Sequence, residues 1–219
     1  MKKGEGMSKS VYSLVLNDDV VELVDKLARV NECSRSHMIE KILAEAVSYE
    51  TPVIRANNLF DEIERLIGEG DMMRFLEEPS RYMASILSAL PYRYNPAIKY
   101  NVELFPHSNY LGQLKITLRT QNPTLTSLVN AFYQLFTILE KRYYNPNAQY
   151  EFNGIKFIRV LDFPNVELTT QQLAELITEY VKNFNELLNI FLSNQDDEKV
   201  AFTLVEKRFN ELFDREIII

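Results

Sequence analysis

Residues 9–47 read KSVYSLVLNDDVVELVDKLARVNECSRSHMIEKILAEAV, and this stretch predicts one short strand followed by two helices. Every second side chain from Tyr12 to Leu16 is large and apolar, which is the period of a β-strand. A strand is therefore expected over residues 10–16. Its opposite face would carry Val11, Ser13 and Val15.

Two amphipathic helices are expected after this strand. The polar cluster Asn17–Asp19 can cap the first helix and place acids at its positive end, and Ser34 is a natural cap for the second. Apolar residues recur at the three-and-four spacing of a helix. The expected buried stripes are Val20, Leu23, Val24, Leu27, Ala28 and Val30 in the first helix, and Met38, Ile39, Ile42, Leu43, Ala46 and Val47 in the second.

This unit is predicted to need a second copy of the chain. A single strand cannot satisfy its own backbone, and about 40 residues cannot bury a sufficient core alone. Two copies would pair their strands antiparallel over four helices, and the exposed two-stranded ribbon would fit the major groove of B-DNA. The stretch therefore predicts a homodimer, or a higher homo-oligomer, that binds double-stranded DNA.

The segments Tyr12–Leu16, Asn17–Val20 and Ser34–Ile39 resemble the ribbon-helix-helix family, the dimeric bacterial and phage repressors that include Arc and the methionine repressor. The resemblance covers residues 9–50. It implies that the ribbon contacts bases and that the start of the second helix holds a DNA phosphate. The residues it assigns to DNA binding are Lys9, Val11, Ser13, Val15, Ser34, Arg35 and Ser36.

The chain departs from the family pattern at the ribbon and at the turn between the helices. Valines flank Ser13 where polar or basic residues are usual, so base recognition would depend on the Ser13 hydroxyl, apolar contact and Lys9. The turn lacks the usual glycine. Asn31 or Glu32 must then adopt a left-handed backbone conformation, and Asn31 is the better candidate.

The charge of the chain opposes nonspecific attraction to nucleic acid. The formal net charge is -7, and residues 1–50 hold seven Lys and Arg against nine Asp and Glu. The basic residues nearest the ribbon are Lys2, Lys3 and Lys9, and Arg35 lies at the expected phosphate contact. DNA binding is therefore expected to be local and sensitive to salt.

Composition predicts a folded protein with a small and a larger domain. The 219 residues are 46% hydrophobic, which is sufficient for a packed core. No run approaches 18 consecutive apolar residues, and residues 1–6 lack the apolar centre of a signal peptide, so a cytoplasmic location without membrane contact is expected. The single Cys33 cannot form an internal disulfide.

Thr51–Pro52 interrupts the helical pattern and divides the chain into a DNA-binding and dimerisation domain, residues 1–50, and a second domain, residues 51–219. The expected fold class is α+β and mostly α, with the ribbon-helix-helix (βαα) unit followed by a small antiparallel sheet covered by helices. Periodicity places helices at 57–67, 71–90, 124–145, 169–191 and 198–213, and strands at 98–104, 113–120 and 152–162. The apolar tail Ile217–Ile219 needs a partner surface or a place in the core.

The residues do not favour an enzyme, a metal site or a cofactor. The chain has two histidines, His37 and His107, and lacks zinc motifs, serine-nucleophile elbows and glycine-rich phosphate loops. The acids at 18–19 and 196–198 are explained by helix capping. Four tyrosines, which either line a small-ligand pocket or fill the core, with the core favoured, are Tyr82, Tyr92, Tyr94 and Tyr100.

Two functions follow from this reading. The first is a dimeric, sequence-specific transcriptional regulator, a repressor, that inserts its ribbon into the major groove while the second domain adds oligomer contacts or senses a small-molecule or protein effector. The alternative is an interaction or scaffold protein, such as an antitoxin or an accessory factor in partition or conjugation, that uses the first unit mainly for dimerisation. The two valines and the negative charge keep this alternative open, whereas the pattern of residues 9–50 favours the regulator.

Overall fold

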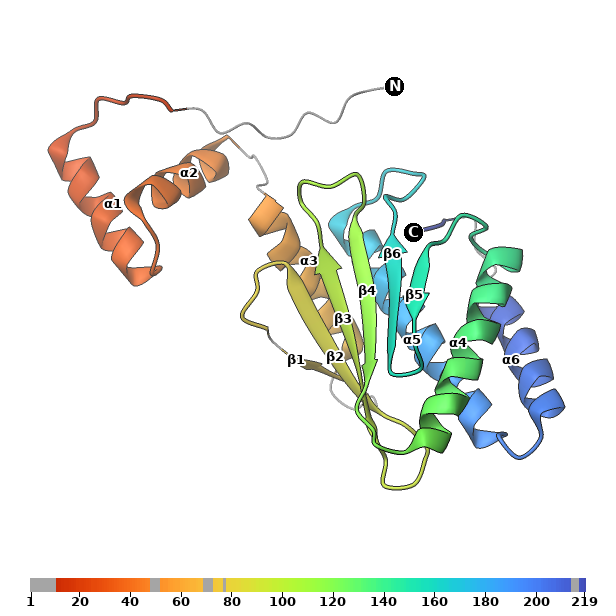
Figure 1. The fold of residues 1–219 in the computed structure, drawn as a ribbon. Helices are drawn as coiled ribbons and strands as arrows, with labels where there is room; N and C mark the ends of the chain where they lie inside the picture. The colour runs from red at the N-terminus through yellow and green to blue at the C-terminus, as the bar shows by residue number, and fades with distance from the viewer. Residues whose placement is uncertain (1–10, 48–51, 69–72, 77, 214–216) are drawn as a thin grey trace. The chain divides into compact units, whose positions relative to one another are not determined.

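The computed structural model describes residues 11–47, 52–68, 73–76, 78–213 and 217–219 (Figure 1). The chain divides into two compact units, Met1–Arg55 and Ala56–Ile219. The first unit contains helices α1 (Asp18–Val30) and α2 (Arg35–Ala46). In the described part of the chain, no helix is long and apolar enough to cross a membrane.

The predicted N-terminal strand is wrong, and so is the predicted βαα unit in the fold class. Residues 11–17 lie before α1 without forming a strand, and the first strand in the described residues is β1 (Met73–Leu76), after three helices. Within one chain the segment has no neighbouring strand to bond its N–H and C=O groups, so alternation of apolar residues is not sufficient to form one. Val11 and Val15 are fully exposed.

Both predicted helices of the first unit, and their caps, are confirmed. The Asn17 Oδ1 atom accepts a hydrogen bond from the Asp19 amide at 2.8 Å, and the Ser34 Oγ atom accepts one from the His37 amide at 3.3 Å. The turn does contain a left-handed residue at one of the two predicted positions, but the preferred candidate is wrong, because Glu32 has the positive φ of 49° whereas Asn31 has φ -93°. Asn31 instead ends α1, and its side-chain amide donates to the Leu27 carbonyl at 2.9 Å.

The second unit is built on a six-stranded antiparallel sheet in the order β1-β2-β3-β4-β6-β5. Its register aligns Ile86, Tyr100, Ile116 and Phe157 on four adjacent strands, and all four are completely buried. The strands after β1 are β2 (Met83–Ala89), β3 (Ala97–Leu104), β4 (Gly112–Leu118), β5 (Tyr150–Phe152) and β6 (Lys156–Leu161).

Four helices accompany this sheet (Figure 1): α3 (Pro52–Ile67), α4 (Pro123–Tyr143), α5 (Thr170–Ser193) and α6 (Glu198–Leu212). Helices α4 and α5 pack on the face that carries Phe157, as contacts of its ring with Phe136 of α4 and Phe184 of α5 show. Helix α6 packs against α4, where the rings of Phe209 and Phe136 meet. The opposite face of the sheet carries partly exposed polar residues such as Lys99 and Lys115. The sheet is therefore covered by helices on one side only, as predicted.

The sheet is larger than predicted because residues 73–76 and 83–89, which were expected to be helical, form the strands β1 and β2. Met83, Ile86 and Leu90 match a helical spacing, but in the structure these residues belong to β2 and its end, and β2 pairs with β1 and β3. The small residues Ala84 and Ser88 share the buried face with Ile86, which concealed the alternation of a strand. Pairing with β3 outweighs the local helical pattern. The predicted strand at 152–162 corresponds to β6, and its first residue is the last residue of the additional strand β5.

Gly112 lies where the strands of the β3–β4 hairpin come close together. We expect Gly112→Ala to lower the free energy of unfolding by about 1–3 kcal/mol. A Cβ atom there would lie 1.9 Å from the Glu103 carbonyl oxygen, so the two strands would have to separate. Urea denaturation measures the loss. Thr117→Ala on the opposite face of β4 is the control, and equal stability of the two variants would contradict the expected clash.

Candidate functional site

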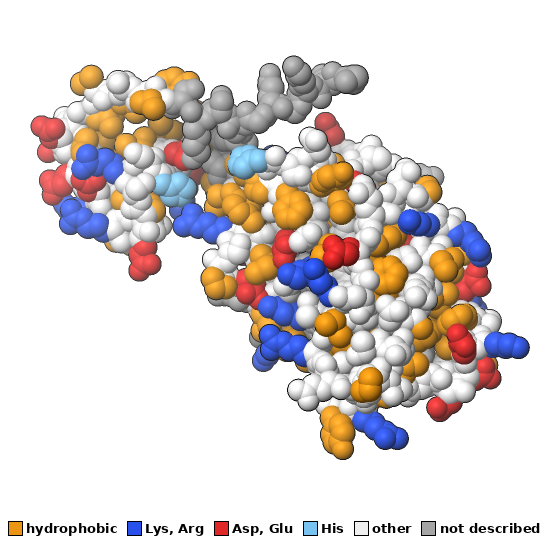
Figure 2. Space-filling model, in the orientation of Figure 1, with side chains coloured by type: hydrophobic (Ala, Val, Ile, Leu, Met, Phe, Trp, Pro, Cys, Tyr) orange, Lys and Arg blue, Asp and Glu red, His pale blue; other side chains and the backbone are white. Residues whose placement is uncertain are grey.

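The first unit buries few of its apolar side chains. Its small core consists of Val24, Ala28 and Met38, with Cys33 and Ile39 packed against it. The other residues of the predicted stripes are exposed, including Leu23 at 59%, Leu27 at 47% and Leu43 at 52%. Hydrophobic side chains are correspondingly visible on the surface of this unit in Figure 2. The further exposed large apolar residues are Val11, Tyr12, Leu14, Val15, Leu16, Val20, Val30, Ile42 and Val47.

Among the described residues, these side chains have no apolar cover on the outer faces of α1 and α2. Leu23 and Leu27 lie one turn apart on α1, so they form a continuous apolar strip. Patches of this kind on a small unit mark an interaction surface. The burial predicted for both helices is thus confirmed only for Val24, Ala28 and Met38, and Ile39 is half-buried.

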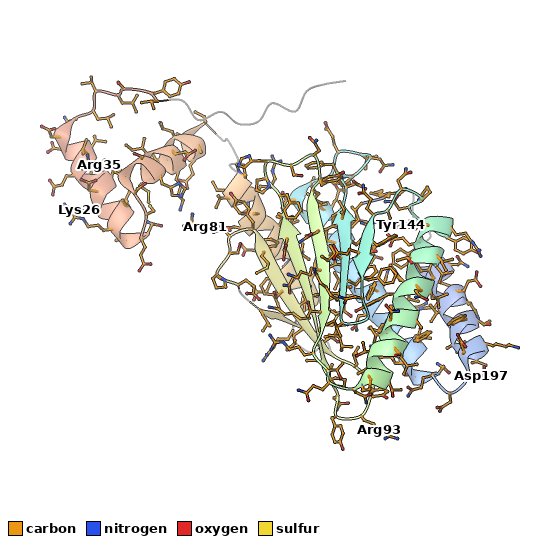
Figure 3. The ribbon with its side chains drawn as sticks, in the orientation of Figure 1. Lys26, Arg35, Arg81, Arg93, Tyr144 and Asp197 are labelled. Carbon is orange, nitrogen blue, oxygen red and sulfur yellow. The ribbon has the colours of Figure 1, made fainter. Side chains whose placement is uncertain are left out.

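Arg35, one of the residues assigned to DNA phosphate, is held by an acid of α1. Its Nε and Nη2 atoms each lie 2.6 Å from a different carboxylate oxygen of Asp25. The hydrogen bond from Arg35 lowers the pKa of Asp25, and the same bond raises the pKa of Arg35. Figure 3 labels Arg35 together with Lys26, which pairs with Glu22 at 2.9 Å.

The residues predicted to bind DNA fall into two groups. Ser34, Arg35 and Ser36 stand together where α2 begins, and the first turn of this helix contains no acid. Lys9 lies outside the described residues. The second group, exposed on the extended segment before α1, comprises Val11, Ser13 and Val15. Their contact with DNA stays a prediction.

A fully buried ion pair in the second unit was not predicted. The Nη2 atom of Arg159 on β6 lies 2.7 Å from the Oε1 atom of Glu140 on α4, and neither side chain is exposed. The Tyr180 hydroxyl donates to the Glu140 Oε2 atom at 2.8 Å, and burial raises the pKa of Tyr180. Strict alternation along β6 could have revealed the site, because Arg159 occupies the same face as Phe157 and Leu161.

The C-terminal tail completes this buried cluster. The Tyr144 hydroxyl donates to the Ile217 carbonyl at 2.9 Å, and both Arg159 Nη2 and Asn145 Nδ2 donate to the Ile219 oxygen. Ile219 is completely buried. The tail was expected to lie either on a partner surface or in the core, and the second of these predictions is confirmed for Ile219. The charges of the cluster are satisfied by the protein itself, which is the arrangement of a structural site.

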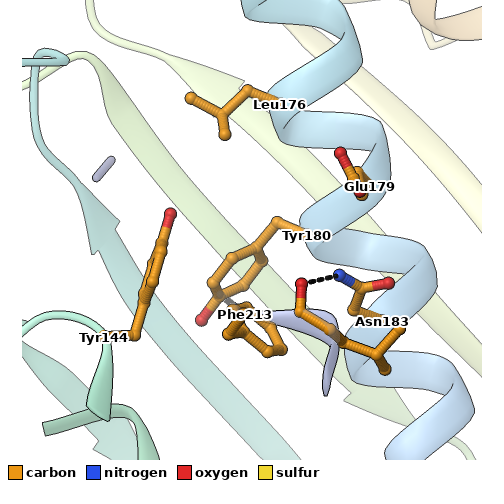
Figure 4. A pocket seen from close by; sticks show the side chains of 7 residues that line it. Tyr144, Leu176, Glu179, Tyr180, Asn183 and Phe213 are labelled. Carbon is orange, nitrogen blue, oxygen red and sulfur yellow. Dashed lines mark hydrogen bonds between the residues drawn. The ribbon is translucent and has the colours of Figure 1, made fainter. Parts of the chain in front are cut away.

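Two hollows of the second unit were considered as ligand sites. The first lies beside Tyr180 and Asn183 of α5 and Phe213 after α6, where Asn183 donates to the Leu212 carbonyl at 3.4 Å (Figure 4). Its volume of about 10 Å³ holds no more than a water molecule. The second is a shallow polar pocket of about 580 Å³ beside Arg93, also labelled in Figure 3, and Asn122. It contains no buried polar group that would orient a ligand.

The four tyrosines that were expected to line a pocket or fill the core differ in burial and do not line one common pocket. Tyr100 is completely buried, and its hydroxyl donates to the Asn185 Oδ1 atom at 2.9 Å. Tyr94 is fully exposed with a positive φ of 66°, which contradicts a place in the core. Tyr82 and Tyr92 are half-buried at the edge of the core. Within the described ranges, no group of three or more His, Cys, Asp or Glu side chains is arranged to hold a metal ion.

The strongest candidate for a functional surface is therefore the first unit, with its exposed apolar faces and the start of α2. The buried cluster and the two hollows described above lack the space or the buried polar groups that ligand binding requires. Comparison with known proteins yields no family model, no curated protein and no solved structure that matches this chain.

Proposed function

We propose that this chain is a homodimeric DNA-binding regulator whose first unit provides both the subunit contact and the DNA contact. The observation that carries the proposal is the exposure of the apolar faces of α1 and α2. The resemblance of residues 9–50 to the ribbon-helix-helix family supports the DNA contact. The second unit, with its own core, would then add oligomer contacts or sense an effector.

A second copy is the partner that best fits these faces. Fully burying a leucine contributes about 1.5–3 kcal/mol, and Leu23, Leu27 and Leu43 are each about half exposed, so each offers about half of that value as a driving force for association. Closed two-fold dimers are the commonest assemblies of soluble proteins, and in them the same surface of each copy is covered. A dimer would thus supply the core that the isolated unit lacks.

The DNA contact would involve the exposed segment Val11–Val15 and the beginning of α2. Because α2 starts without acids, its positive end can attract a phosphate, whereas Asp18 and Asp19 occupy the corresponding end of α1. The valine methyl groups can contact thymine methyl groups, and the Ser13 hydroxyl can bond a base edge.

The combined variant Leu23→Asp and Leu27→Asp is expected to be monomeric and to lose DNA affinity by at least about tenfold, because charged side chains cannot be buried at the subunit contact. Analytical ultracentrifugation measures the oligomeric state. Electrophoretic mobility shift with the duplex upstream of the coding sequence, at several salt concentrations, measures binding.

The matched control is Val200→Asp with Leu204→Asp on α6, which has the same spacing and similar exposure, 44% and 40%. This control should leave both the dimer and the DNA complex intact. A dimer that survives the α1 substitutions would overturn the proposed interface.

The interaction or scaffold function is the second candidate, and the Asp25–Arg35 pair is the observation that favours it. In the structure the side chain of Arg35, which was predicted to bind a DNA phosphate, is already hydrogen-bonded to the carboxylate of Asp25. A wild-type dimer that forms no salt-sensitive complex with any duplex tested would select this alternative.

A further inference from the structure

We propose that Asp25 sets the DNA affinity of the first unit by competing with DNA phosphate for the guanidinium of Arg35. This inference rests on the proposed DNA-binding function. It assigns a role to an acidic residue of α1 that does not itself contact DNA.

The geometry shows a complete but accessible ion pair. Arg35 uses Nε and Nη2, one edge of its guanidinium, to bond both oxygens of Asp25 at 2.6 Å. The Arg35 side chain is nevertheless 56% exposed, and that of Asp25 is 26% exposed. The pair therefore stands at the surface, at the first residue of α2, where an approaching anion can reach it.

Carboxylate and phosphate compete for the same feature of arginine. Both present two oxygens that match the planar fork of N–H donors, so the edge bonded to Asp25 cannot serve a phosphate at the same time. The negative charge of Asp25 also repels a phosphate that approaches Arg35. An exposed ion pair contributes only about 0.2–1 kcal/mol, so a phosphate can replace the carboxylate at a modest cost in affinity.

Asp25 remains charged under the conditions of DNA binding. The hydrogen bond from Arg35 lowers the pKa of Asp25, and the positive charges of Arg35 and Arg29 act in the same direction. The neighbouring acid Glu22 pairs separately with Lys26, at 2.9 Å and in an exposed position. Glu22 thus offers the same charge on the same helix without touching Arg35.

The experiment compares Asp25→Asn with Glu22→Gln, since each removes one negative charge from α1. Binding to a mixed-sequence duplex of about three helical turns is measured by fluorescence anisotropy at low salt. Asp25→Asn should bind roughly fivefold more tightly than wild type, because two pairs are released in a dimer. Glu22→Gln should remain within about twofold of wild type. In an Arg35→Ala background, Asp25→Asn should give no gain.

Circular dichroism and ultracentrifugation verify that Asp25→Asn remains folded and dimeric, and Asp25→Ser provides a second neutral variant. Equal gains in Asp25→Asn and Glu22→Gln would show general electrostatics and overturn the proposal. Weaker binding by both Asp25 variants would also overturn it, since the pair would then only hold α1 and α2 together. If neither the wild type nor any variant forms a complex, the proposed DNA-binding function itself fails. This outcome differs from the one in which the proteins bind DNA but the Asp25 variants bind more weakly than wild type.

Discussion

Replacing Glu140 by alanine is expected to lower the free energy of unfolding of the second unit by about 3–5 kcal/mol. The substitution leaves the guanidinium of Arg159 completely buried without its carboxylate partner. It also removes the acceptor of the Tyr180 hydroxyl. Uncompensated burial of a charge is the larger of the two costs, because the interior cannot replace the solvation that water provides.

Urea denaturation followed by far-UV circular dichroism measures this loss through the shift of the midpoint. The informative control is the double variant Glu140→Leu with Arg159→Met, which removes both charges and keeps most of the volume. It should recover most of the lost stability, since replacing a buried ion pair by apolar residues is often nearly neutral. A double variant as unstable as the sum of both single variants would show that the two residues act independently.

Replacing Phe184 by alanine is expected to cost about 3–5 kcal/mol, because it opens a cavity at the centre of the second core. The ring of Phe184 lies 4.6 Å from Phe136, 5.3 Å from Phe132 and 5.4 Å from Phe157, measured between ring centroids. These partners come from α4 and β6. Removing the ring would therefore weaken the packing of the helices against the sheet. Phe184 is completely buried.

Phe202→Ala on α6 is the matched control for this cavity. Phe202 is only partly buried, and its ring stacks on Phe191 with a centroid distance of 6.0 Å. Its loss should cost less than half as much as that of Phe184. Comparable midpoints in urea for the two variants would contradict the central role of Phe184.

The helices of this chain were largely predictable because their signals are local. Asn17 and Ser34 cap α1 and α2 through bonds to amides two and three residues ahead, so the residue types alone identify the starts. The predicted strands at 98–104 and 113–120 were also recognisable from alternation, and they are confirmed as β3 and β4, which pair with each other. These interactions need no information from distant parts of the chain.

Strand pairing was predictable only where the alternation of large side chains was clear. At β2, Ala84 and Ser88 obscure it, and the choice between helix and strand depends on β3, with Tyr100 opposite Ile86. At residues 11–16 the alternation is clear, but the chain offers no partner strand, so the predicted strand is absent. Local pattern is therefore not sufficient for a strand, which always requires a second segment.

The sequence by itself determined the helical pair of the first unit, the residues at its caps, and the apolar stripes along its helices. Only the tertiary structure decided that Arg35 bonds Asp25, that Arg159 and Glu140 are buried together, and that the tail carbonyl groups complete their cluster. The physical reason is distance along the chain. Capping and periodicity act within a few residues, whereas Arg159 meets the Ile219 oxygen across 60 positions, and only a folded chain brings such groups together.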